Sequence, residues 1–231
     1  LKKFNPNLVV IFGDRVELVP ISIASSYNGT AIAHIQAGDK SGHIDDMTRM
    51  MLSKIVHIHL PSTKISANRL HKLGEQNFRI FNVGAPQLDD INLRKILKKK
   101  NIQINNKDFD LKKENFLILI QHPVFTDRKN YKNIFLKTLK ACMSFNYKTI
   151  LIYPNYDPGY KEMIKLIKKY DYKNEKLIIL KNLERQTFLS LLANSKCLVG
   201  NSSCGILEAP SLKVGVINIG DRQDGREKNK N

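Results

Sequence analysis

Short apolar runs alternate with stretches of helical periodicity along most of the chain. Leu8–Phe12 and Ala31–Ile35 are apolar runs of strand length, whereas Ile44, Met47 and Met51 recur at helical spacing. In the first half the pattern predicts strands over 8–12, 31–35, 56–60 and 78–83 and helices over 16–27, 44–56 and 63–73, the last capped by Ser62 or Thr63. In the second half it predicts strands over 116–120, 149–153, 177–180, 196–199 and 214–219 and helices near 130–145, 160–170, 185–194 and 204–209. Apolar strands between helices are typical of parallel sheets covered on both faces.

A polar stretch rich in lysine and asparagine separates the two series of elements. It predicts three parts: a Rossmann-like domain over 1–97, a linker over 98–115 and a second Rossmann-like domain over 116–231. Candidate site residues all follow predicted strands, as in Gly13-Asp14, Gln36-Ala-Gly38, Gln121-His122, Asn155 to Asp157 and Asn201 to Ser203. Since ligands of such sheets bind outside the carboxyl ends of the strands, we expect one cleft between the domains.

The net charge of +17 raises the question of a nucleic-acid partner. The lysines are spread along predicted helices beside many asparagines and isoleucines, and no motif of interleaved aromatic and basic residues accompanies them. We therefore expect no nucleic-acid partner; the positive electrostatic field of the chain would equally attract an anionic small substrate.

No apolar run reaches the roughly 18 residues of a membrane span, so no membrane partner is expected. Three cysteines without metal spacing (Cys142, Cys197 and Cys204) favour reduced thiols in a cytoplasm.

The segment Gly200-Asn-Ser-Ser-Cys-Gly205 follows a predicted strand and precedes a short helical stretch. This order predicts that Ser202, Ser203 and the neighbouring N–H groups lie at a helix N-terminus, which suits a phosphate. Glu208 would lie close enough to accept bonds from a ribose hydroxyl pair, and Arg222 and Arg226 in the next loop could bind a diphosphate. The alternative is a strand, turn and helix with polar turn residues and no ligand.

Other candidate residues also have structural interpretations. Asp14 is either the N-cap of the following helix or a cleft carboxylate. Asp45, Asp46 and Arg49 could serve the helix dipole and pair within the helix, Asp45 with Arg49, or could belong to a site. His122, at a strand end before a proline, suits a cleft better than a core, whereas His34 inside a predicted strand is expected to be structural.

Several separated motifs, taken in order, resemble the UDP-N-acetylglucosamine 2-epimerase family over nearly the whole chain. They are Gly13-Asp-Arg-x-Glu17, His34-Ile-Gln-Ala-Gly38, Ile44-Asp-Asp-x-x-Arg49, Phe81-Asn-Val-Gly84, Gln121-His-Pro123, Pro154-Asn-x-Asp157, Gly200-Asn-Ser-Ser-Cys-Gly205 and Gly220-x-Arg-Gln-x-Gly-Arg226. The third and seventh motifs are similar to those of the hydrolysing branch of the sialic-acid pathway. The non-hydrolysing branch usually carries Pro-Glu-Glu-x-Asn-Arg and Asp-Ser-Gly-Gly instead.

The resemblance implies an α/β fold of two Rossmann-like domains facing a cleft, of the glycosyltransferase B type. It implies an enzyme that eliminates UDP from UDP-N-acetylglucosamine to give a glycal and then adds water, which releases N-acetylmannosamine. No hydride moves, so no nicotinamide or other cofactor and no metal are expected. The chemistry needs a base near the C2 proton, an acid on the opposite face and stabilisation of the departing UDP. A homo-oligomer is expected for the full-length protein.

Carried over residue by residue, the resemblance implies acid/base roles for Asp14 and Asp45, supported by Asp46 and Arg49, with His122 near the diphosphate and the sugar. The residues implied in binding UDP or substrate are Gln36, Asn155, Asp157, Ser202, Ser203, Gly205, Glu208 and Arg222, with the serines on phosphate and Glu208 on ribose.

Two departures from the family pattern stand out. The family often has a glutamate where this chain has Gln36, and a glutamine cannot take a proton at neutral pH, so Asp39 or Asp14 would be the base, or turnover would be reduced. The opening βαβ unit and the terminal helices are also missing, and the chain begins at Leu1 rather than Met, so the fold is expected to be incomplete at both ends and the fragment unstable or inactive.

Several functions remain open at this point. The alternatives to a hydrolysing epimerase are a non-hydrolysing epimerase, an enzyme acting on a related diacetamido sugar, a glycosyltransferase of the same architecture, and a degenerate protein that binds UDP-sugar without turnover. A basic nucleic-acid scaffold ranks last.

Overall fold

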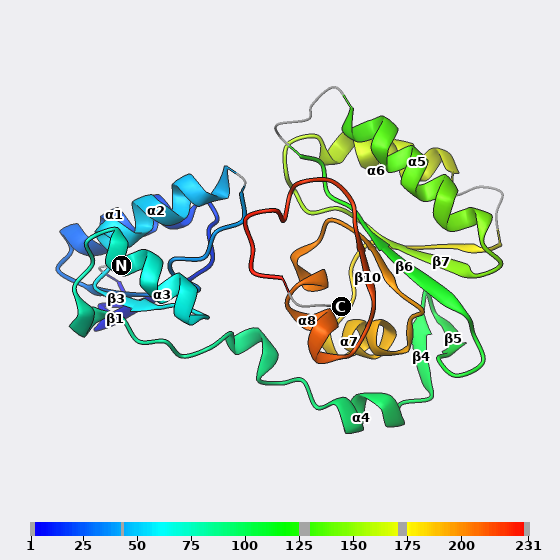
Figure 1. Cartoon of the computed structure of the whole chain (residues 1–231), viewed down its shortest axis with the longest axis horizontal. Helices are drawn as coiled ribbons and strands as arrows, with labels where there is room; N and C mark the ends of the chain where they lie inside the picture. The colour runs from blue at the N-terminus through cyan, green and yellow to red at the C-terminus, as the bar shows by residue number, and fades with distance from the viewer. Residues whose placement is uncertain (1–2, 43, 125–129, 171–174, 229–231) are drawn as a thin grey trace. The chain divides into compact units, whose positions relative to one another are not determined.

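The computed structural model describes residues 3–42, 44–124, 130–170 and 175–228. The chain forms two compact units (Figure 1). Unit 1 contains the described residues up to Asp89 together with Asp224–Arg226, and unit 2 contains those of Asp90–Gln223 together with Glu227 and Lys228. The two units are described in turn.

Unit 1 is built on a parallel sheet of three strands in the order β1-β2-β3. Its elements are β1 (Leu8–Phe12), α1 (Leu18–Tyr27), β2 (Ala31–Ile35), α2 (Asp45–Ile55), β3 (Ile58–Leu60), α3 (Lys64–Lys72) and the single 3-10 turns η1 (Asn77–Arg79) and η2 (Pro86–Leu88). Of the two proposed caps of α3, Thr63 is the N-cap, because its side chain accepts a hydrogen bond from the N–H of Ser66.

The strand expected over 78–83 is wrong. Residues 77–79 form η1, and Ile80 makes only an isolated parallel bridge to His59. The apolar residues that suggested a strand, Phe78, Phe81 and Val83, are exposed, so this run buries no continuous face. Apolar character without a partner surface does not make a strand.

The apolar core of unit 1 is small. Ile11, Ile32, Leu52 and Val56 form its buried cluster, which joins β1 and β2 to α2. Every second residue of β1 lies outside this cluster, because Leu8, Val10 and Phe12 are 44–56% exposed. The strand therefore has an apolar face that the described part of the chain leaves in solvent.

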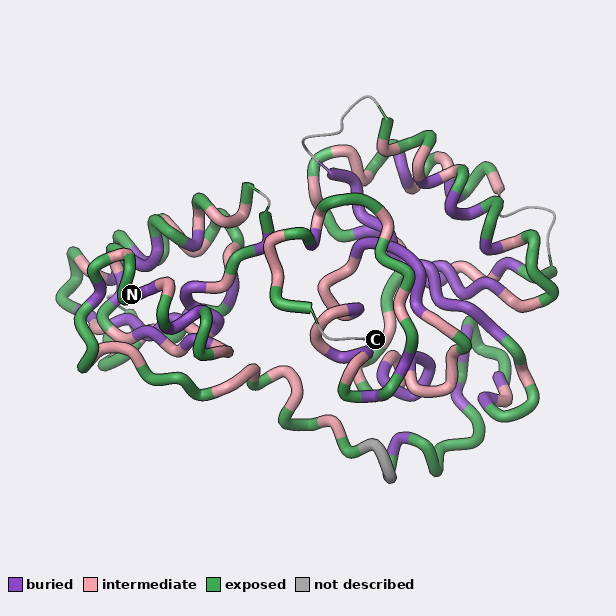
Figure 2. The backbone as a smooth tube through the Cα atoms, in the orientation of Figure 1, coloured by how far each residue is buried: buried purple, intermediate pink, exposed green. Residues whose placement is uncertain are grey.

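Unit 2 contains a parallel sheet of five strands in the order β10-β9-β6-β7-β8. Its elements are α4 (Leu93–Lys98), β4 (Asn101–Ile104), β5 (Lys107–Asp110), β6 (Phe116–Ile120), α5 (Tyr131–Ser144), β7 (Lys148–Ile152), α6 (Tyr160–Tyr170), β8 (Leu177–Leu180), α7 (Arg185–Asn194), β9 (Leu198–Gly200), the 3-10 turn η5 (Ser203–Gly205), α8 (Glu208–Ser211) and β10 (Val216–Asn218). The buried stretches of the backbone follow the central strands (Figure 2).

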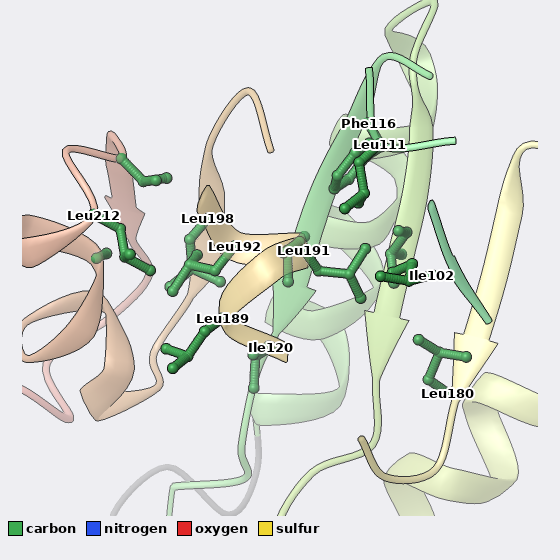
Figure 3. Close-up of a cluster of buried hydrophobic side chains, with 14 of the residues drawn as sticks. Ile102, Leu111, Phe116, Ile120, Leu180, Leu189, Leu191, Leu192, Leu198 and Leu212 are labelled. Carbon is green, nitrogen blue, oxygen red and sulfur yellow. The ribbon is translucent and has the colours of Figure 1, made fainter. Parts of the chain in front are cut away.

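Both faces of this sheet are covered, as the continuous apolar strands predict. On β6, Phe116, Ile118 and Ile120 enter one cluster with Leu residues of α7 (Figure 3). The alternate residues Leu117 and Leu119 enter a second cluster with buried side chains of α5 and α6. The period of two along the strand thus sends neighbouring residues to opposite cores.

The linker expected over 98–115 is wrong for its central part, where β4 and β5 form an antiparallel hairpin. Ile102, Ile104 and Phe109 alternate with polar residues, and their side chains are buried in the first core cluster of unit 2. Asn105 and Asn106 both have positive φ values, 49° and 60°, which suits a two-residue hairpin turn. The lysines and asparagines are the solvent face of this hairpin rather than a linker.

Candidate functional site

In unit 1, charged side chains gather around a buried arginine at the ends of β1 and β2. Arg49, on α2, has a side chain only 2% exposed. Its guanidinium pairs with the carboxylate of Asp14, which follows β1, and with Asp46 Oδ1 at 3.1 Å, and it donates to the carbonyl oxygen of Asp39 at 2.9 Å. The ion pairs that the structure gives Arg49 therefore join it to Asp14 and Asp46, and not to Asp45, the partner named in the interpretation of pairing within the helix.

Asp46 is held as a carboxylate by its surroundings. Its oxygens accept hydrogen bonds from the N–H and hydroxyl of Ser41 at 2.7 and 2.9 Å and from the N–H of Gly42 at 2.8 Å. Burial alone would raise the pKa of Asp46, but these hydrogen bonds and the Arg49 charge lower it below its usual value. Asp46 therefore anchors Arg49 and the 41–42 turn and is poorly suited to donate a proton.

Asp39, the alternative base, lies in the same group of polar residues. Its Oδ1 accepts from the hydroxyl of Ser66 at 2.8 Å, and its Oδ2 lies 3.7 Å from Nη1 of Arg226. Arg226 belongs to unit 1, where Gly225 donates to the carbonyl of Ser41 at 3.0 Å. A Cβ on Gly225 would lie 2.5 Å from the nitrogen of Gly42. Arg226 was expected to bind a diphosphate; the described contact pairs it with a carboxylate.

Gln36 occupies an unusual backbone conformation directly after β2. Its φ is 62°, a region that costs a non-glycine residue conformational energy, and its N–H donates to the carbonyl of Leu60 at 3.0 Å. The residue is 7% exposed, and within the described structure its Nε2 is buried without a hydrogen-bond partner. Strain and an unpaired amide at a strand end are typical of a functional position.

Asp45 and His34 complete the residues of interest in unit 1. Asp45 begins α2 and is half-buried. His34 is fully buried within β2, and its Nε2 lies 2.7 Å from the carbonyl oxygen of Gly13. Burial lowers the pKa of His34 to about 4, so the ring is neutral and structural, as expected from the sequence.

In unit 2, a polar pocket of about 280 Å³ opens at the carboxyl ends of the parallel strands. Polar side chains on its wall include His122, Asn155, Ser202 and Arg185. The other residues of the wall are Ile120, Ile152, Tyr153, Asn182, Leu183, Phe188 and Cys204, most of them apolar. Apolar walls with a few convergent polar groups are typical of small-molecule sites.

His122 is fixed in this pocket by two neighbouring loops. The side chain of Asn201 accepts from the N–H of His122 at 2.7 Å and donates to its carbonyl at 2.9 Å. The N–H of Asn155 donates to Nδ1 of His122 at 3.0 Å, so in the neutral ring the proton lies on Nε2. Burial, with the Arg222 charge, lowers the pKa of His122 to about 3. His122 is therefore a hydrogen-bond donor near neutral pH and not a cationic acid.

Arg222 and Asp157 lie close to this histidine. Arg222 Nη2 lies 3.2 Å from Asp157 Oδ2, and its Nη1 donates to the carbonyl of Asn201 at 3.3 Å. The buried side chain of Gln223 donates to the same carbonyl at 3.0 Å. The structure thus brings together His122, Asn155, Asp157 and Arg222, which the sequence places on three separate loops.

The helix expected to begin near Ser202 and Ser203 is wrong. Ser203–Gly205 is a single 3-10 turn, and the following helix α8 is only four residues long. A macrodipole of that length is small, so a phosphate site here would depend on hydroxyl and N–H donors rather than on the dipole. A Cβ on Gly205 would lie 2.9 Å from Val216, so its small size also serves packing against β10.

Cys204 is not a nucleophile in this arrangement. Its thiol donates to the Ser202 hydroxyl at 3.2 Å, and burial raises its pKa to about 12. All three cysteines are free thiols.

Glu208 has two neighbours that the sequence did not indicate. Its side chain is 11% exposed, and Nη1 of Arg185 lies 3.4 Å from its Oε1. Burial raises the pKa of Glu208, an effect that Arg185 partly offsets. The Nε and Nη2 atoms of Arg185 bind both carboxylate oxygens of Asp90 at 2.7 and 2.8 Å. Asp90 and Arg185 are 95 residues apart, and neither belongs to a motif, so no local signal could have paired them.

Two properties of the described residues bear on partners. No three His, Cys, Asp or Glu side chains among them gather as a metal site requires. Within the same residues, no helix combines the length and the apolar content that crossing a membrane demands.

Comparison with known proteins decides the family. The model of the family described as UDP-N-acetylglucosamine 2-epimerase matches residues 1–231. The chain belongs to this family. The resemblance carried by the separated motifs is therefore confirmed.

Among relatives, the chain is 36% identical over 227 residues to the hydrolysing UDP-N,N'-diacetylbacillosamine 2-epimerase of Legionella pneumophila. The aligned residues are 98% of this chain and 59% of the relative. It is 32% identical over 228 residues to the UDP-N-acetylglucosamine 2-epimerase of Neisseria meningitidis serogroup B, covering 99% of this chain and 59% of that protein. The chain thus spans 59% of the length of these curated relatives.

The fold is similar to that of solved structures. The chain aligns with a co-structure of S. aureus MnaA with UDP at a TM-score of 0.73 and 19% identity, covering 93% of this chain and 57% of that one. A UDP-GlcNAc 2-epimerase of Methanocaldococcus jannaschii in complex with UDP-GlcNAc and UDP aligns with a TM-score of 0.70 and 21% identity, covering 94% of this chain and 61% of that one. The expected α/β class with Rossmann-like units of the glycosyltransferase B type is confirmed.

Proposed function

We propose that this chain acts in a hydrolysing UDP-N-acetylglucosamine 2-epimerase, which converts the nucleotide sugar and water into N-acetylmannosamine and UDP. The observation that carries the proposal is the pocket of unit 2, where a neutral, firmly held His122 shares the wall with the polar residues Ser202, Asn155 and Arg185 and with several apolar side chains. Membership of the family supports the same substrate class.

Unit 2 would bind the nucleotide part. The pocket residues Phe188 and Leu183 offer apolar contact to a nucleobase, Phe188 through its flat ring. Glu208, whose side chain is 11% exposed and which pairs with the pocket residue Arg185, can accept bonds from ribose hydroxyls. Ser202 and Ser203 can donate to phosphate oxygens, and Arg222 adds a charge near His122. These donors would stabilise the negative charge that develops on the departing UDP.

Unit 1 would supply the acid/base groups. In the elimination, a carboxylate takes the C2 proton, a C1–C2 double bond forms, and UDP leaves with the electron pair of the C1–O bond. In the second step, water adds to C1 and a proton is delivered to C2 from the opposite face. We propose Asp14 and Asp45 for these roles, with Asp39 as the candidate that replaces a glutamate at position 36. Arg49 and Asp46 would hold Asp14 in place.

An isotope experiment tests this proposal. The protein is incubated with UDP-N-acetylglucosamine in deuterated water, and UDP and the sugars are followed by NMR. Deuterium at C2 of free N-acetylmannosamine is the expected result. Deuterium in a UDP-linked sugar would indicate the non-hydrolysing reaction, and acceptor-dependent release without C2 exchange would indicate a transferase. Bound but unchanged nucleotide would indicate a degenerate binding protein.

Substitutions test the assigned residues. Asp14→Asn and Asp45→Asn should each lower kcat by about 10²-fold or more, because a positioned acid or base contributes on that order. The matched control is Glu114→Gln, which removes a surface ion pair with Lys148 at 2.7 Å and should leave the rate unchanged. If both aspartate variants keep the full rate while remaining folded, their acid/base roles are wrong.

A diacetamido sugar is the second candidate substrate. The hydrolysing relative of Legionella pneumophila at 36% identity and one of Campylobacter jejuni at 34% identity are named N,N'-diacetylbacillosamine 2-epimerases. Parallel assays with UDP-N-acetylglucosamine and UDP-N,N'-diacetylbacillosamine would distinguish the two by their kcat/KM values. The substrate with the higher value is assigned to this protein.

We also propose a cytoplasmic homo-oligomer for the full-length protein. The three free thiols fit a reducing compartment. Size-exclusion chromatography with light scattering measures the oligomeric state, and a monomeric mass at all concentrations would contradict this part of the proposal.

A further inference from the structure

Arg185 lies in the nucleotide pocket proposed above but belongs to none of the sequence motifs. It is the first residue of α7, and its side chain is 37% exposed on the pocket wall together with Ser202 and Asn155. Its position raises the question of which ligand atom it would meet.

The geometry around Glu208 answers this question. Nη1 of Arg185 and Oε1 of Glu208 are 3.4 Å apart, a long contact that places a hydrogen-bond donor beside a hydrogen-bond acceptor. A vicinal diol has the matching chemistry, since one hydroxyl can donate to the carboxylate while an oxygen of the pair accepts from the guanidinium. In a nucleotide, the ribose 2'- and 3'-hydroxyls are such a diol.

Asp90 explains how the guanidinium is kept in this orientation. Both of its carboxylate oxygens are bound by Nε and Nη2 of Arg185, and Gln186 Nε2 donates to Oδ2 at 3.3 Å. A bidentate pair fixes the plane of the guanidinium as well as its distance. The third nitrogen, Nη1, is thereby directed along the side of Glu208.

We propose that Arg185 donates to the ribose hydroxyl pair that Glu208 binds in the proposed function and that Asp90 is the positioning residue of Arg185. The inference rests on the proposed function, because it takes the ligand of this pocket to be a nucleoside diphosphate. It adds to that function a donor on Arg185 and a support on Asp90, two residues that carry no other assigned role.

The test compares UDP with its 2'-deoxy and 3'-deoxy analogues by calorimetry, on the wild type and on variants. Wild type should bind UDP about tenfold or more tightly than at least one deoxy analogue, because a hydroxyl lost opposite charged partners leaves them unpaired. Arg185→Ala should weaken the binding of UDP about tenfold. It should weaken the binding of the deoxy analogue that wild type disfavours by less than about threefold, so the preference for UDP falls.

Two further variants separate positioning from charge. Arg185→Lys keeps the charge but loses the bidentate fork, and it should lose most of the preference for UDP. Asp90→Asn should lower the preference by a smaller factor, about threefold, because Arg185 remains but is held less well. Glu114→Gln is the control on the same unit and should bind UDP and both analogues as wild type does. Circular dichroism melting checks that each variant is folded.

Several outcomes would overturn the inference. If Arg185→Ala weakens UDP and both deoxy analogues equally, Arg185 acts through general charge or structure and not on the diol. If Arg185→Lys keeps the full preference for UDP, the fork and its support by Asp90 have no role. If wild type binds UDP but prefers it over neither analogue, the diol is not recognised, although the proposed function stands. If wild type binds no UDP at all, the proposed function fails together with the inference.

Discussion

The two units of the chain hold their residues together by different means. Unit 2 buries apolar side chains on both faces of a five-stranded sheet, with Phe116, Leu119 and Phe135 among the fully buried ones. In unit 1 the apolar cluster has four buried members, and the largest fully buried side chain of the described structure, that of Arg49, belongs to this unit. The comparison indicates that the stability of unit 1 depends on directional polar contacts, whereas the stability of unit 2 depends on buried apolar area.

A second polar group in unit 1 supports this contrast. The buried carboxylate of Glu75 lies 2.7 Å from Lys54 Nζ, 2.5 Å from Arg79 Nη2 and 3.4 Å from His59 Nε2. Such networks are stable only while every member is paired, because a single lost partner leaves a buried charge. The stability of unit 1 is therefore expected to respond more to changes in charge and pH. The stability of unit 2 is expected to respond more to changes in side-chain volume and to atoms added close to the backbone.

The largest effect is expected for Gly200→Ala in unit 2. Gly200 has a φ of 131°, and an added Cβ would overlap the carbonyl group of Ile120 on the neighbouring strand. Backbone cannot yield as a side chain does, so we expect a loss of about 3 kcal/mol or more in the free energy of unfolding. Urea unfolding followed by tyrosine fluorescence measures this, because Tyr27 is the only one of the described tyrosines that lies outside unit 2.

Gly215→Ala is the matched control. An added Cβ there would meet no atom within 4 Å, so we expect a change within about 0.5 kcal/mol. Similar losses for both glycines would mean that the close approach of β9 to β6 does not limit the stability of unit 2.

The next largest effect is expected for Arg49→Met in unit 1. The variant keeps much of the volume but leaves Asp14 and Asp46 without their ion pair, and removing one partner of a buried pair costs about 3–5 kcal/mol. Because both carboxylates are partly exposed, we expect about 2–3 kcal/mol. Hydrogen exchange in peptides from α2 measures it.

The tyrosine signal of unit 2 serves as the internal control for Arg49→Met. It should keep the wild-type urea midpoint. If unit 2 lost as much stability by this measure as α2 loses by hydrogen exchange, the effect of Arg49 would not be confined to unit 1.

A pH effect of intermediate size is expected from His34. Its pKa is about 4 in the folded protein and about 6.5 when unfolded, so between these values the unfolded state binds the extra proton. The stability of unit 1 should therefore fall as pH decreases from 6.5 to 4, by about 2 kcal/mol at pH 5. Hydrogen exchange in peptides from β2 at pH 7 and pH 5 checks the sign, after correction for the intrinsic rates.

His34→Gln should reduce this pH dependence, because a glutamine amide can still donate to the carbonyl of Gly13 but does not titrate in this range. Some dependence should remain, because burial also lowers the pKa of His59 in the same unit. In unit 2, the pKa of His122 is about 3, so the stability of this unit should continue to fall with decreasing pH to a lower value than in unit 1. An unchanged pH dependence in His34→Gln would exclude His34 as its source.

The smallest effect is expected at the start of α3. Thr63→Ala removes the hydroxyl that accepts from the N–H of Ser66 at 3.1 Å, and the loss of an N-cap costs about 1 kcal/mol. Ser62→Ala, one residue earlier, removes a hydroxyl without a described hydrogen-bond partner and should cost less. Hydrogen exchange in α3 compares the two, and equal losses would contradict the assignment of the cap to Thr63.

Regular elements with a strong local pattern could be predicted from the sequence. The helices over 160–170 and 185–194 have the expected bounds, and strand β6 was expected over its full length. Predictions failed where local pattern and burial disagree. The run 78–83 is apolar but exposed, and the stretch 98–115 is polar in composition but buries the alternate residues of a hairpin. Burial depends on which surface lies opposite, and composition does not contain that information.

The candidate site divides in the same way. Each residue at the end of a parallel strand, such as Asp14 or His122, could be found from its position in the sequence. The protonation of His122 could not, because it follows from a hydrogen bond donated by Asn155 and from burial. The hydrogen bond from the N–H of Gly225 to the carbonyl of Ser41 could not be predicted either. A loop that follows the last strand carries no local signal for the unit to which it belongs.

The sequence by itself determined the alternation of strands and helices, the parallel sheets and the family, because these depend on local periodicity and on short motifs. The tertiary structure alone decided the partners of the charged groups: Arg49 with Asp14 rather than Asp45, and Arg185 with Asp90 and Glu208. An ion pair depends on distance and burial, and both are set by how segments far apart in the chain pack.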